Sequence, residues 1–467
     1  MRLQEAHILR AESPPVNGDS RIPHEMKWLK TIALVLAACV VLLALVPFFI
    51  SVSAYIPAIE KEISARLEEP VSIDDLKLAL LPAPHLTIEG IAIGSAQDVK
   101  IAKLSLKPDL LSLVRANKVI RSVEADDLVV TQQALVAIFA LARRDSGGGG
   151  AVRVEQIRLD KIVVKLERGS FGPLDVRVQV SGGERPGDIQ LRTRDDAFEA
   201  HLTPEGEHYV LEITARDWTP PLGPAVRFDE LKVKGVATSK QADLNDIAAK
   251  IYGGTASGKA TIGWEKGVTL KGSLAVTRVE MKPLAALFSR EARLSGRLDA
   301  KPVFTAHAQK ADQLDDTLRL ETPFTVHDGV LHGVDIAQAA ASVLRQGSTG
   351  GETRFDKLGG RLLMERGSYR FTQLDISSGL LAARGNVTIA PNKSLSGELN
   401  ANVAGIGRAI AVPLTVAGTV ESPMVYPNAS ALAGAALGTA VLGPGIGTAA
   451  GAKLGGIVEG ILGRKKK

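Results

Sequence analysis

The spacing of hydrophobic residues changes along this chain, and each spacing predicts a different kind of element. Residues 31–50 form an uninterrupted apolar run of twenty residues without a charge. A helix rises ~1.5 Å per residue, so a run of this length spans the ~30 Å hydrocarbon core of a bilayer. We therefore expect a single transmembrane anchor within residues 27–56.

The charges that flank this run predict its orientation. Arg21, Lys27 and Lys30 precede it, whereas acidic and basic residues are mixed after it. Because cytoplasmic flanks carry the excess of Lys and Arg, residues 1–26 are expected to be a cytoplasmic, disordered tail. The bulk of the chain is then expected on the far side of the membrane. Residues 26–30 look like a start region, so it stays open whether residues 1–25 are translated.

Three other interpretations of the apolar run stay open. Residues 51–53 are small and fit the cleavage site of a signal peptide, although such signals have an apolar core of only ~7–15 residues. Residues 36–39 match a lipobox, at which bacterial lipoproteins are cut and lipidated, but the chain does not turn polar after Cys39. The third is a buried helix of a soluble domain, in which apolar runs of this length are uncommon.

After the anchor the apolar residues first follow a helical period and then recur at every second position. The first pattern predicts an amphipathic helix at residues 55–67, and the second predicts strands with one apolar face. The expected strands are residues 72–80, 85–93, 99–106 and 119–130, with a helical turn at 109–114, a helix at 132–144 and a linker at glycines 147–150.

Alternation of apolar and polar residues continues from residue 152 to residue 308 and returns nearer the C-terminus. One side of each strand is therefore apolar, and an open sheet must cover or curl around such a face. The side chains expected to line one apolar groove are Leu174, Val176, Val178, Val180, Leu211, Ile213, Leu274, Val276, Val387, Ile389 and Leu399.

A unit of one glycine followed by alternating positions recurs, as at residues 258–262, 272–276 and 385–389. These glycines either begin strands after turns or mark bends of a curved sheet. Further elements are expected as helices at 282–288 and 335–345 and strands at 354–364, 368–374, 380–389, 395–403 and 413–420. The expected fold is mainly β with a few short helices, namely one transmembrane helix followed by a long curled antiparallel sheet with an apolar groove.

The last forty residues have a different composition, rich in glycine and alanine. Gly443, Gly447, Gly451 and Gly455 recur at every fourth position, a spacing that lets helices approach closely in lipid. We interpret this zipper as a membrane-inserting or self-associating hairpin that ends in a basic cluster. The alternative is a poorly ordered Gly/Ala tail.

Composition and motifs exclude several functions. The net charge of +5 comes largely from the last four residues, and no basic patch carries interleaved aromatic residues, so nucleic acid is not an expected partner. The only cysteine is Cys39, so the exported part has no disulfide.

No catalytic constellation is found either. Residues 253–260 resemble a phosphate-binding loop but have Ala260 where the magnesium ligand would stand. His327 and His332 flank an expected turn, and solvated histidines explain them better than a metal pair. The aspartate pairs at 126–127, 195–196 and 315–316 are expected to point to opposite faces of strands. We therefore expect no enzyme, no cofactor and no metal.

Two regions resemble the AsmA family of Gram-negative envelope proteins. The first is a proline-broken strand at residues 71–91, then Lys107-Pro108-Asp109-Leu110-Leu111 after a strand, and a valine–acid–valine strand at 120–130. The second comprises residues 326–335, 353–360, 385–387 and 412–423. The resemblance implies an inner-membrane protein, single pass, with its bulk in the periplasm. It further implies phospholipid as cargo, an influence on outer-membrane assembly, and envelope proteins as partners.

The expected organisation follows from these patterns. The segments are a tail at 1–26, the anchor at 27–56, AsmA-like modules at 57–146 and 311–428, a middle β region at 147–310 and the zipper tail at 429–467. Roughly eighteen strands at ~4.8 Å give a groove of ~85 Å at most, which implies a partner or a shuttle step. The alternative function is an assembly scaffold that pairs a sheet edge with strands of outer-membrane proteins.

Overall fold

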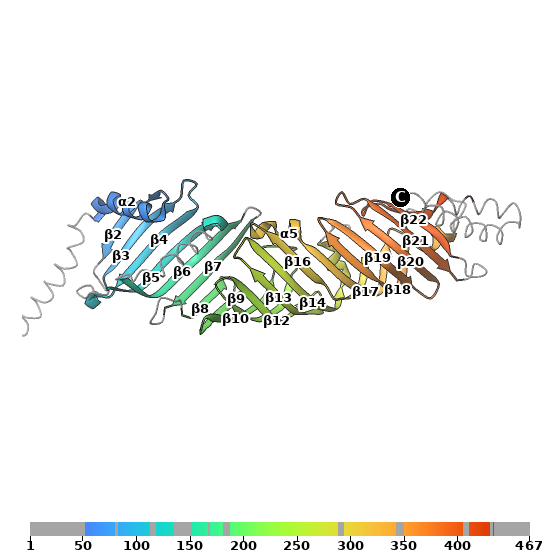
Figure 1. Cartoon of the computed structure of the whole chain (residues 1–467), viewed down its shortest axis with the longest axis horizontal. Helices are drawn as coiled ribbons and strands as arrows, with labels where there is room; N and C mark the ends of the chain where they lie inside the picture. The colour runs from blue at the N-terminus through green and yellow to red at the C-terminus, as the bar shows by residue number, and fades with distance from the viewer. Residues whose placement is uncertain are drawn as a thin grey trace, which may run out of the picture.

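The protein is an elongated β-sheet structure with a few short helices, as Figure 1 shows. Strands make up 67% and helices 13% of the described residues of this computed structural model, so the mainly β prediction is confirmed. The structure describes residues 52–79, 83–112, 118–134, 152–166, 169–180, 187–287, 294–341, 350–404, 411–429 and 433.

Twenty-three strands form one sheet among the described residues. The strands are β1 (Val71–Ser72), β2 (Asp75–Ala79), β3 (His85–Ile93), β4 (Val99–Pro108), β5 (Lys118–Thr131), β6 (Val152–Leu166), β7 (Gly169–Gln179), β8 (Ile189–Thr193), β9 (Phe198–Glu205), β10 (His208–Trp218), β11 (Phe228–Ala237), β12 (Gln241–Ile251), β13 (Gly254–Gly263), β14 (Val268–Glu280), β15 (Leu294–Ala300), β16 (Val303–Ala308), β17 (Arg319–His332), β18 (Glu352–Glu365), β19 (Ser368–Ser377), β20 (Leu381–Ile389), β21 (Leu395–Val403), β22 (Val412–Gly418) and β23 (Pro423–Pro427).

The described helices are short. They are the 3-10 helices η1 (Val52–Tyr55), η2 (Leu110–Ser112) and η4 (Ala311–Gln313), and the α-helices α2 (Ile56–Leu67), α4 (Met281–Ala286), α5 (Leu314–Thr317) and α6 (Ile336–Ala341). Pro57 stands in the first turn of α2, where a missing N–H costs nothing, and Glu68 ends this helix in the left-handed conformation.

The strands follow one another through the sheet almost in chain order. β1 and β2 lie end to end and pair with different parts of β3. β15 and β16 likewise lie end to end between β14 and β17. All pairs are antiparallel except β5–β6, which are parallel. The expectation of an antiparallel sheet is therefore wrong at this pair. Residues 132–151 lie between the two strands and supply the dozen or more residues that a parallel connection needs.

Most element boundaries agree with the period-two pattern. β3 and β21 have the predicted bounds, and the predicted strand at 72–80 is divided into β1 and β2. β23 was not predicted, because Pro423 and Pro427 interrupt its pattern. The sheet continues without a break across the boundaries predicted at 146/147 and 310/311, so the division into modules stays a prediction.

Several predicted segments lie outside the described residues. These are the anchor run at 31–50, most of the helix at 132–144, the glycines 147–150 and the zipper glycines of the C-terminal tail. Within the described part of the chain, no helix combines the length and the apolar character that a membrane crossing requires.

Helices α2, α4 and α6 pack against the apolar side of the sheet. Ile56, Ile59 and Ile63 of α2 join a cluster with strands β1–β4 at the N-terminal end. Leu284 of α4 joins the cluster of the middle strands. At the C-terminal end, Ile336 of α6 is 1% exposed within the largest cluster. The sheet is therefore covered at particular places and not along its whole length.

Candidate functional site

One face of the sheet carries an unbroken row of apolar residues, which we call the first apolar row. Its members are direct cross-strand partners, one from each of nineteen strands, and none is charged. They are Leu78, Leu86, Leu106, Val123, Ile157, Val178, Ile189, Leu202, Leu211, Gly235, Leu244, Ala260, Gly272, Phe304, Leu320, Met364, Tyr369, Ile389 and Leu395. The register thus keeps one apolar face continuous from β2 to β21.

A second apolar row runs beside the first, two residues away on each strand, or three across the bulge of β12. It extends from Leu76 on β2 to Leu274 on β14 through thirteen strands, again without a charge. β-Bulges occur where the register shifts, as between Leu244 and Ile247, and they keep the apolar residues on the same side. Two adjacent rows make a band, which we call the apolar band.

The register brings the predicted groove residues to this face of the sheet. Val178, Leu211 and Ile389 belong to the first row, and Val176, Ile213 and Leu274 belong to the second. Neighbouring positions on the same face hold Leu174, Val276, Val387 and Leu399, and Val180 follows the end of β7. Whether these side chains bind a ligand stays a prediction.

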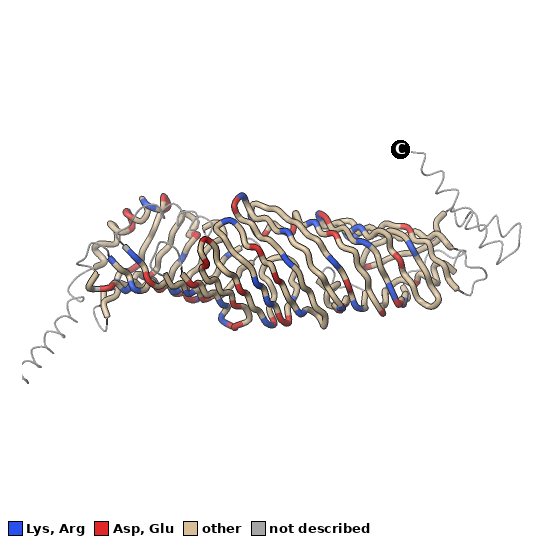
Figure 2. The backbone as a smooth tube through the Cα atoms, turned by 60° about the horizontal axis from the view of Figure 1, so that its bottom comes forward, with Lys and Arg blue, Asp and Glu red and all other residues tan. Residues whose placement is uncertain are grey.

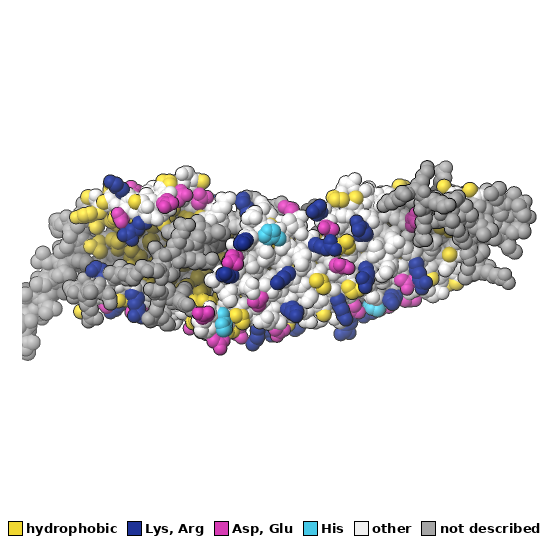
Figure 3. Space-filling view, viewed as in Figure 1, with side chains coloured by type: hydrophobic (Ala, Val, Ile, Leu, Met, Phe, Trp, Pro, Cys, Tyr) yellow, Lys and Arg dark blue, Asp and Glu magenta, His cyan; other side chains and the backbone are white. Residues whose placement is uncertain are grey.

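The apolar band is neither a closed core nor a free surface. Sixteen of the nineteen residues of the first row are half-buried, whereas only Leu211, Gly235 and Ala260 are buried. Figure 3 shows hydrophobic side chains gathered beneath α2 at the N-terminal end, where the surface is hollowed. Aliphatic side chains that stay partly exposed over a band of this length are typical of a binding surface.

The C-terminal end of the same face is closed by α6. Ala339 and Ala340 are 1% and 3% exposed, and Ala383 and Ala401 of the sheet are fully buried at 0%. Small side chains on both surfaces allow the helix to approach the strands β21–β23 closely. The apolar face is therefore packed beneath α6 and more open toward the middle strands.

The opposite face of the sheet is polar. A row of direct partners from Lys77 on β2 to Asp246 on β12 contains only charged residues, histidine, glutamine, serine and threonine. Figure 2 shows positive and negative residues interspersed along the middle strands. Alternate positions of each strand thus separate an aqueous face from an apolar face.

Ion pairs tie neighbouring strands together on the polar face. The Glu230 carboxylate lies 2.7 Å from Lys232 Nζ and 2.8 Å from Lys250 Nζ of the next strand. Hydrogen bonds from Lys232 and then Lys250 lower the pKa of Glu230 from 4.5 to about 2. Such exposed pairs contribute little individually, but they oppose any exchange of the two faces.

The N-terminal edge of the sheet is covered by side chains of α2. The Val71 N–H donates to Ser64 Oγ at 3.0 Å, and the Ile73 N–H donates to Glu60 Oε1 at 2.7 Å. A strand edge presents unpaired N–H groups to other chains unless they are blocked. Two of these groups are already satisfied here.

The C-terminal edge is blocked in another way. The Asn428 N–H donates to the Pro413 carbonyl at 3.1 Å, so the even-numbered residues of β23 direct their N–H groups toward β22. The backbone nitrogens of the odd-numbered residues 423, 425 and 427 therefore point away from β22, and two of these residues are prolines. Val425 is left with the single outward N–H of this strand, which disfavours addition of another strand.

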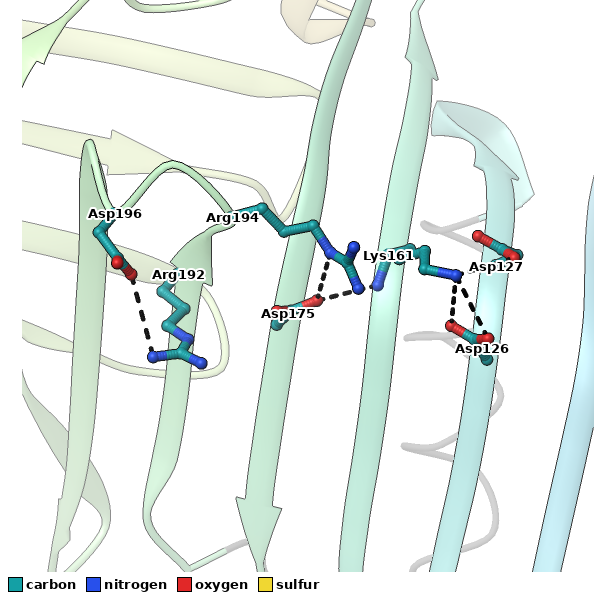
Figure 4. Close-up of polar contacts among 7 residues, drawn as sticks. All are labelled: Asp126, Asp127, Lys161, Asp175, Arg192, Arg194 and Asp196. Atoms are coloured by element: carbon teal, nitrogen blue, oxygen red, sulfur yellow. Dashed lines mark hydrogen bonds and ion pairs between the residues drawn. The ribbon is translucent and has the colours of Figure 1, made fainter.

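Figure 4 shows charged residues of β5–β8 and of the turn that follows β8, and they correct one expectation. Asp126 and Asp127 do not point to opposite faces, because both carboxylates contact Lys161 Nζ, at 3.3 and 3.2 Å. Asp127 has a φ of 53°, and this left-handed conformation interrupts the alternation of side chains along β5. Hydrogen bonds from Asp127 and then Asp126 raise the pKa of Lys161.

The other aspartate pairs were also placed wrongly, because neither lies in a strand. Asp195 and Asp196 belong to the turn between β8 and β9, where Asp195 accepts a hydrogen bond from the Ala197 N–H. Asp315 and Asp316 lie in α5.

The remaining candidate chemical groups are also accounted for. His327 and His332 contact different carboxylates, Asp299 at 3.3 Å and Glu352 at 2.8 Å. The segment that resembles a phosphate-binding loop forms the start of β13, as its pattern indicated. Among the described residues, no group of three or more His, Cys, Asp or Glu is arranged to hold a metal ion.

Sequence reasoning missed an aromatic row at one border of the apolar band. Phe171, Phe198, Trp218 and Phe228 follow one another, with ring centroids 6.3, 4.8 and 6.2 Å apart. The four residues come from β7, β9, β10 and β11. Because they lie at strand ends and are far apart in the sequence, only the register reveals them.

Comparison with known proteins returned no match, whether with family models, with curated proteins or with solved structures.

Proposed function

We propose that this chain binds phospholipid along the apolar band and carries or holds it as an inner-membrane-anchored periplasmic protein. The observation that carries the proposal is the first apolar row, which stays uncharged through nineteen strands and stays half-buried at sixteen positions. Support of outer-membrane homeostasis would be the consequence of this binding. Membership of the AsmA family is part of the same proposal.

The chemistry of the band suits acyl chains. Its walls are mostly Leu, Val, Ile and Ala, and each buried CH₂ of a ligand contributes ~0.8 kcal/mol. Aliphatic walls without converging polar groups hold a flexible chain but do not select one shape. The charged rows stay on the opposite face, so a chain moving along the band meets no desolvation barrier from a buried charge.

The length of the band sets a limit on what it does alone. The twenty-three strands occupy twenty-one strand positions across the sheet, because β1 and β2 share one position and β15 and β16 share another. At ~4.8 Å per strand position the sheet is ~100 Å long, and α6 covers its last strands. We therefore propose that a partner protein or a shuttle step completes the transfer.

The scaffold alternative, in which a sheet edge pairs with strands of outer-membrane proteins, is less well supported. Glu60 and Ser64 occupy N–H groups at one edge, and Pro423 and Pro427 remove N–H groups at the other. Edges treated in this way resist strand addition. The apolar face is the surface that still requires a partner.

Site-specific photocrosslinking tests the proposal in the full-length protein. A photoreactive benzoylphenylalanine replaces Ile213 of the second apolar row, and the protein is irradiated in cells and analysed by intact mass spectrometry. We expect adducts with the mass of phospholipids. Thr214, the next residue of β10, is exposed on the polar face and is the matched control. Val178 and Arg177 on β7 form a second such pair.

Two outcomes would contradict the proposal. One is a folded protein without a lipid adduct at either Ile213 or Val178. The other is equal adduct formation at the positions on the apolar band and at the control positions on the polar face, which would indicate only non-specific contact with lipid. As an independent check, Ile213→Asp and Val178→Asp are expected to remove copurified phospholipid while the fold survives, because a carboxylate in the band would need to be desolvated.

A further inference from the structure

An indentation among the strands of the C-terminal half of the sheet gathers positive charge. Its volume is about 350 Å³, and it lies between β16, β17 and β18. Lys301, Arg319 and Arg361 come to it from three consecutive segments of the sheet, and Glu321 is the single carboxylate in its lining. The lining therefore has three cations against one anion.

The indentation exists because two prolines interrupt the sheet at the same place. The ladder between β16 and β17 ends at Val303 and Glu321, and that between β15 and β17 resumes at Ala300 and Phe324. Pro302 and Pro323 lie in the gap, and neither has an N–H to donate. The strands therefore separate locally, and a surface depression forms.

The gap is held open by a defined set of hydrogen bonds and is not a frayed segment. The Lys301 N–H donates to Thr322 Oγ1 at 3.1 Å and to the Pro323 carbonyl at 3.3 Å. The Thr322 hydroxyl donates to the Pro323 carbonyl at 2.7 Å, and Thr322 is 5% exposed. A buried threonine thus fixes the backbone from which the Lys301 side chain projects.

The cations differ in how firmly they are already paired. Arg319 Nη1 lies 3.4 Å from Glu365 Oε2, so this guanidinium is partly neutralised at the border. Among the described residues, Lys301 and Arg361 have no carboxylate within ion-pair distance of their side chains. Arg361 stands directly opposite Pro323 across the ladder and faces the gap. Two unpaired cations on a fixed backbone are suited to hold an oxyanion.

Apolar groups complete the lining. Val303 is 57% exposed, and Phe304 and Pro323 contribute further carbon surface. A guanidinium and an ammonium match the geometry of a phosphate group, and the adjacent carbon surface suits the organic part of an ester. We propose that this indentation binds the phosphate group of a phosphate ester through Lys301 and Arg361, with Arg319 at its border.

Arg319 and Glu321 alternate along β17 with Leu320 of the first apolar row, so these charged residues project from the face opposite the apolar band. Phe304 of the first apolar row also borders the indentation. A lipid headgroup and a free phosphate ester would present the same anion. Titration of the full-length protein in nonionic detergent with inorganic phosphate, glycerol 1-phosphate and dihexanoyl phosphatidic acid separates these sources. Equal affinity for all three indicates a free-phosphate site, and a preference for the acylated probe indicates a headgroup site.

Isothermal titration calorimetry at low salt is expected to show one saturable site, whose affinity falls as salt is added. Arg361→Ala and Lys301→Ala are each expected to weaken binding roughly ten-fold, because each removes a charge-assisted hydrogen bond. Lys357→Ala removes an exposed cation from the same strand outside the indentation and is expected to leave the affinity unchanged. The melting temperatures of the three variants check that each is folded.

Either of two results would overturn the inference. The first is the absence of saturable binding of all three probes to the unsubstituted protein. The second is an equal loss of affinity in Lys357→Ala and Arg361→Ala, which would mean that the probes respond to diffuse surface charge and not to this indentation.

Discussion

The middle of the apolar face is proposed to be a groove, whereas its C-terminal end is a packed core. Truncation of a side chain to alanine should therefore lower the free energy of unfolding by different amounts at the two places. Leu414 on β22 is 1% exposed in the cluster beneath α6, whereas Ile213 on β10 is half-buried in the apolar band. Truncation to alanine removes three carbons from either residue. The comparison therefore holds the chemistry constant and varies only the surroundings.

The expected costs follow from burial. Loss of three fully buried carbons at Leu414 costs ~2.4 kcal/mol at ~0.8 kcal/mol each, and the enclosed cavity raises the total to about 3–4 kcal/mol. Ile213 is partly buried against two clusters of the sheet, so most but not all of its surface is out of water and no enclosed cavity is left. The cost is about 1.5–2 kcal/mol. The difference of about 1–2.5 kcal/mol exceeds the error of the measurement.

Native-state hydrogen exchange measures both costs in one protein, because a sheet of this length need not unfold in a single step. Leu414→Ala should speed exchange in the β21–β22 peptides by roughly a hundred-fold or more, and Ile213→Ala should speed exchange in the β10–β11 peptides only about ten- to thirty-fold. If Ile213→Ala proves as costly as Leu414→Ala, the middle of the face is filled by protein and the groove does not exist.

Three further predictions concern electrostatics, edges and backbone. Because the folded-state pKa of Glu230 is lowered to about 2, its stabilisation is complete above about pH 4.5 and is lost as the pH falls toward 2; Glu230→Gln should flatten this part of the melting-temperature profile. Replacement of Pro423 and Pro427 by threonine restores outward N–H groups on β23 and should produce self-association in size-exclusion chromatography, whereas an unchanged monomer would show that the prolines do not protect the edge. Gly385→Ala should destabilise by more than 2 kcal/mol, since its Cβ would overlap the Glu398 carbonyl, and Gly379→Ala should be nearly neutral in thermal unfolding, since nothing lies within 4 Å.

The sequence predicts local structure well wherever a strand has one apolar face. β3 and β21 have the predicted bounds, because alternation is regular there and turn residues end both strands. The inward residues of β7 and β10 were predicted for the same reason. Alternation is a property of a few neighbouring residues, so it can be read without knowledge of the pairing.

Pairing and its irregularities could not be predicted in this way. The parallel contact of β5 with β6 depends on where a connection of about twenty residues returns. The left-handed conformation of Asp127 brings its carboxylate to Lys161 beside that of Asp126, and nothing in the alternation signals it. The indentation near Lys301 arises from two prolines that are distant in sequence and meet only through the register.

The nearly sequential order of the strands has a consequence for how the protein is made. Since most strands pair with the next strand of the chain, each hairpin can form soon after its second strand has been synthesised or exported. Growth of the sheet can therefore proceed from β1 toward β23 without waiting for the C-terminus. The strand that is temporarily last has an open edge at every stage, and only the prolines of β23 end this exposure. A chain truncated before β23 should therefore be more prone to aggregation than the complete one.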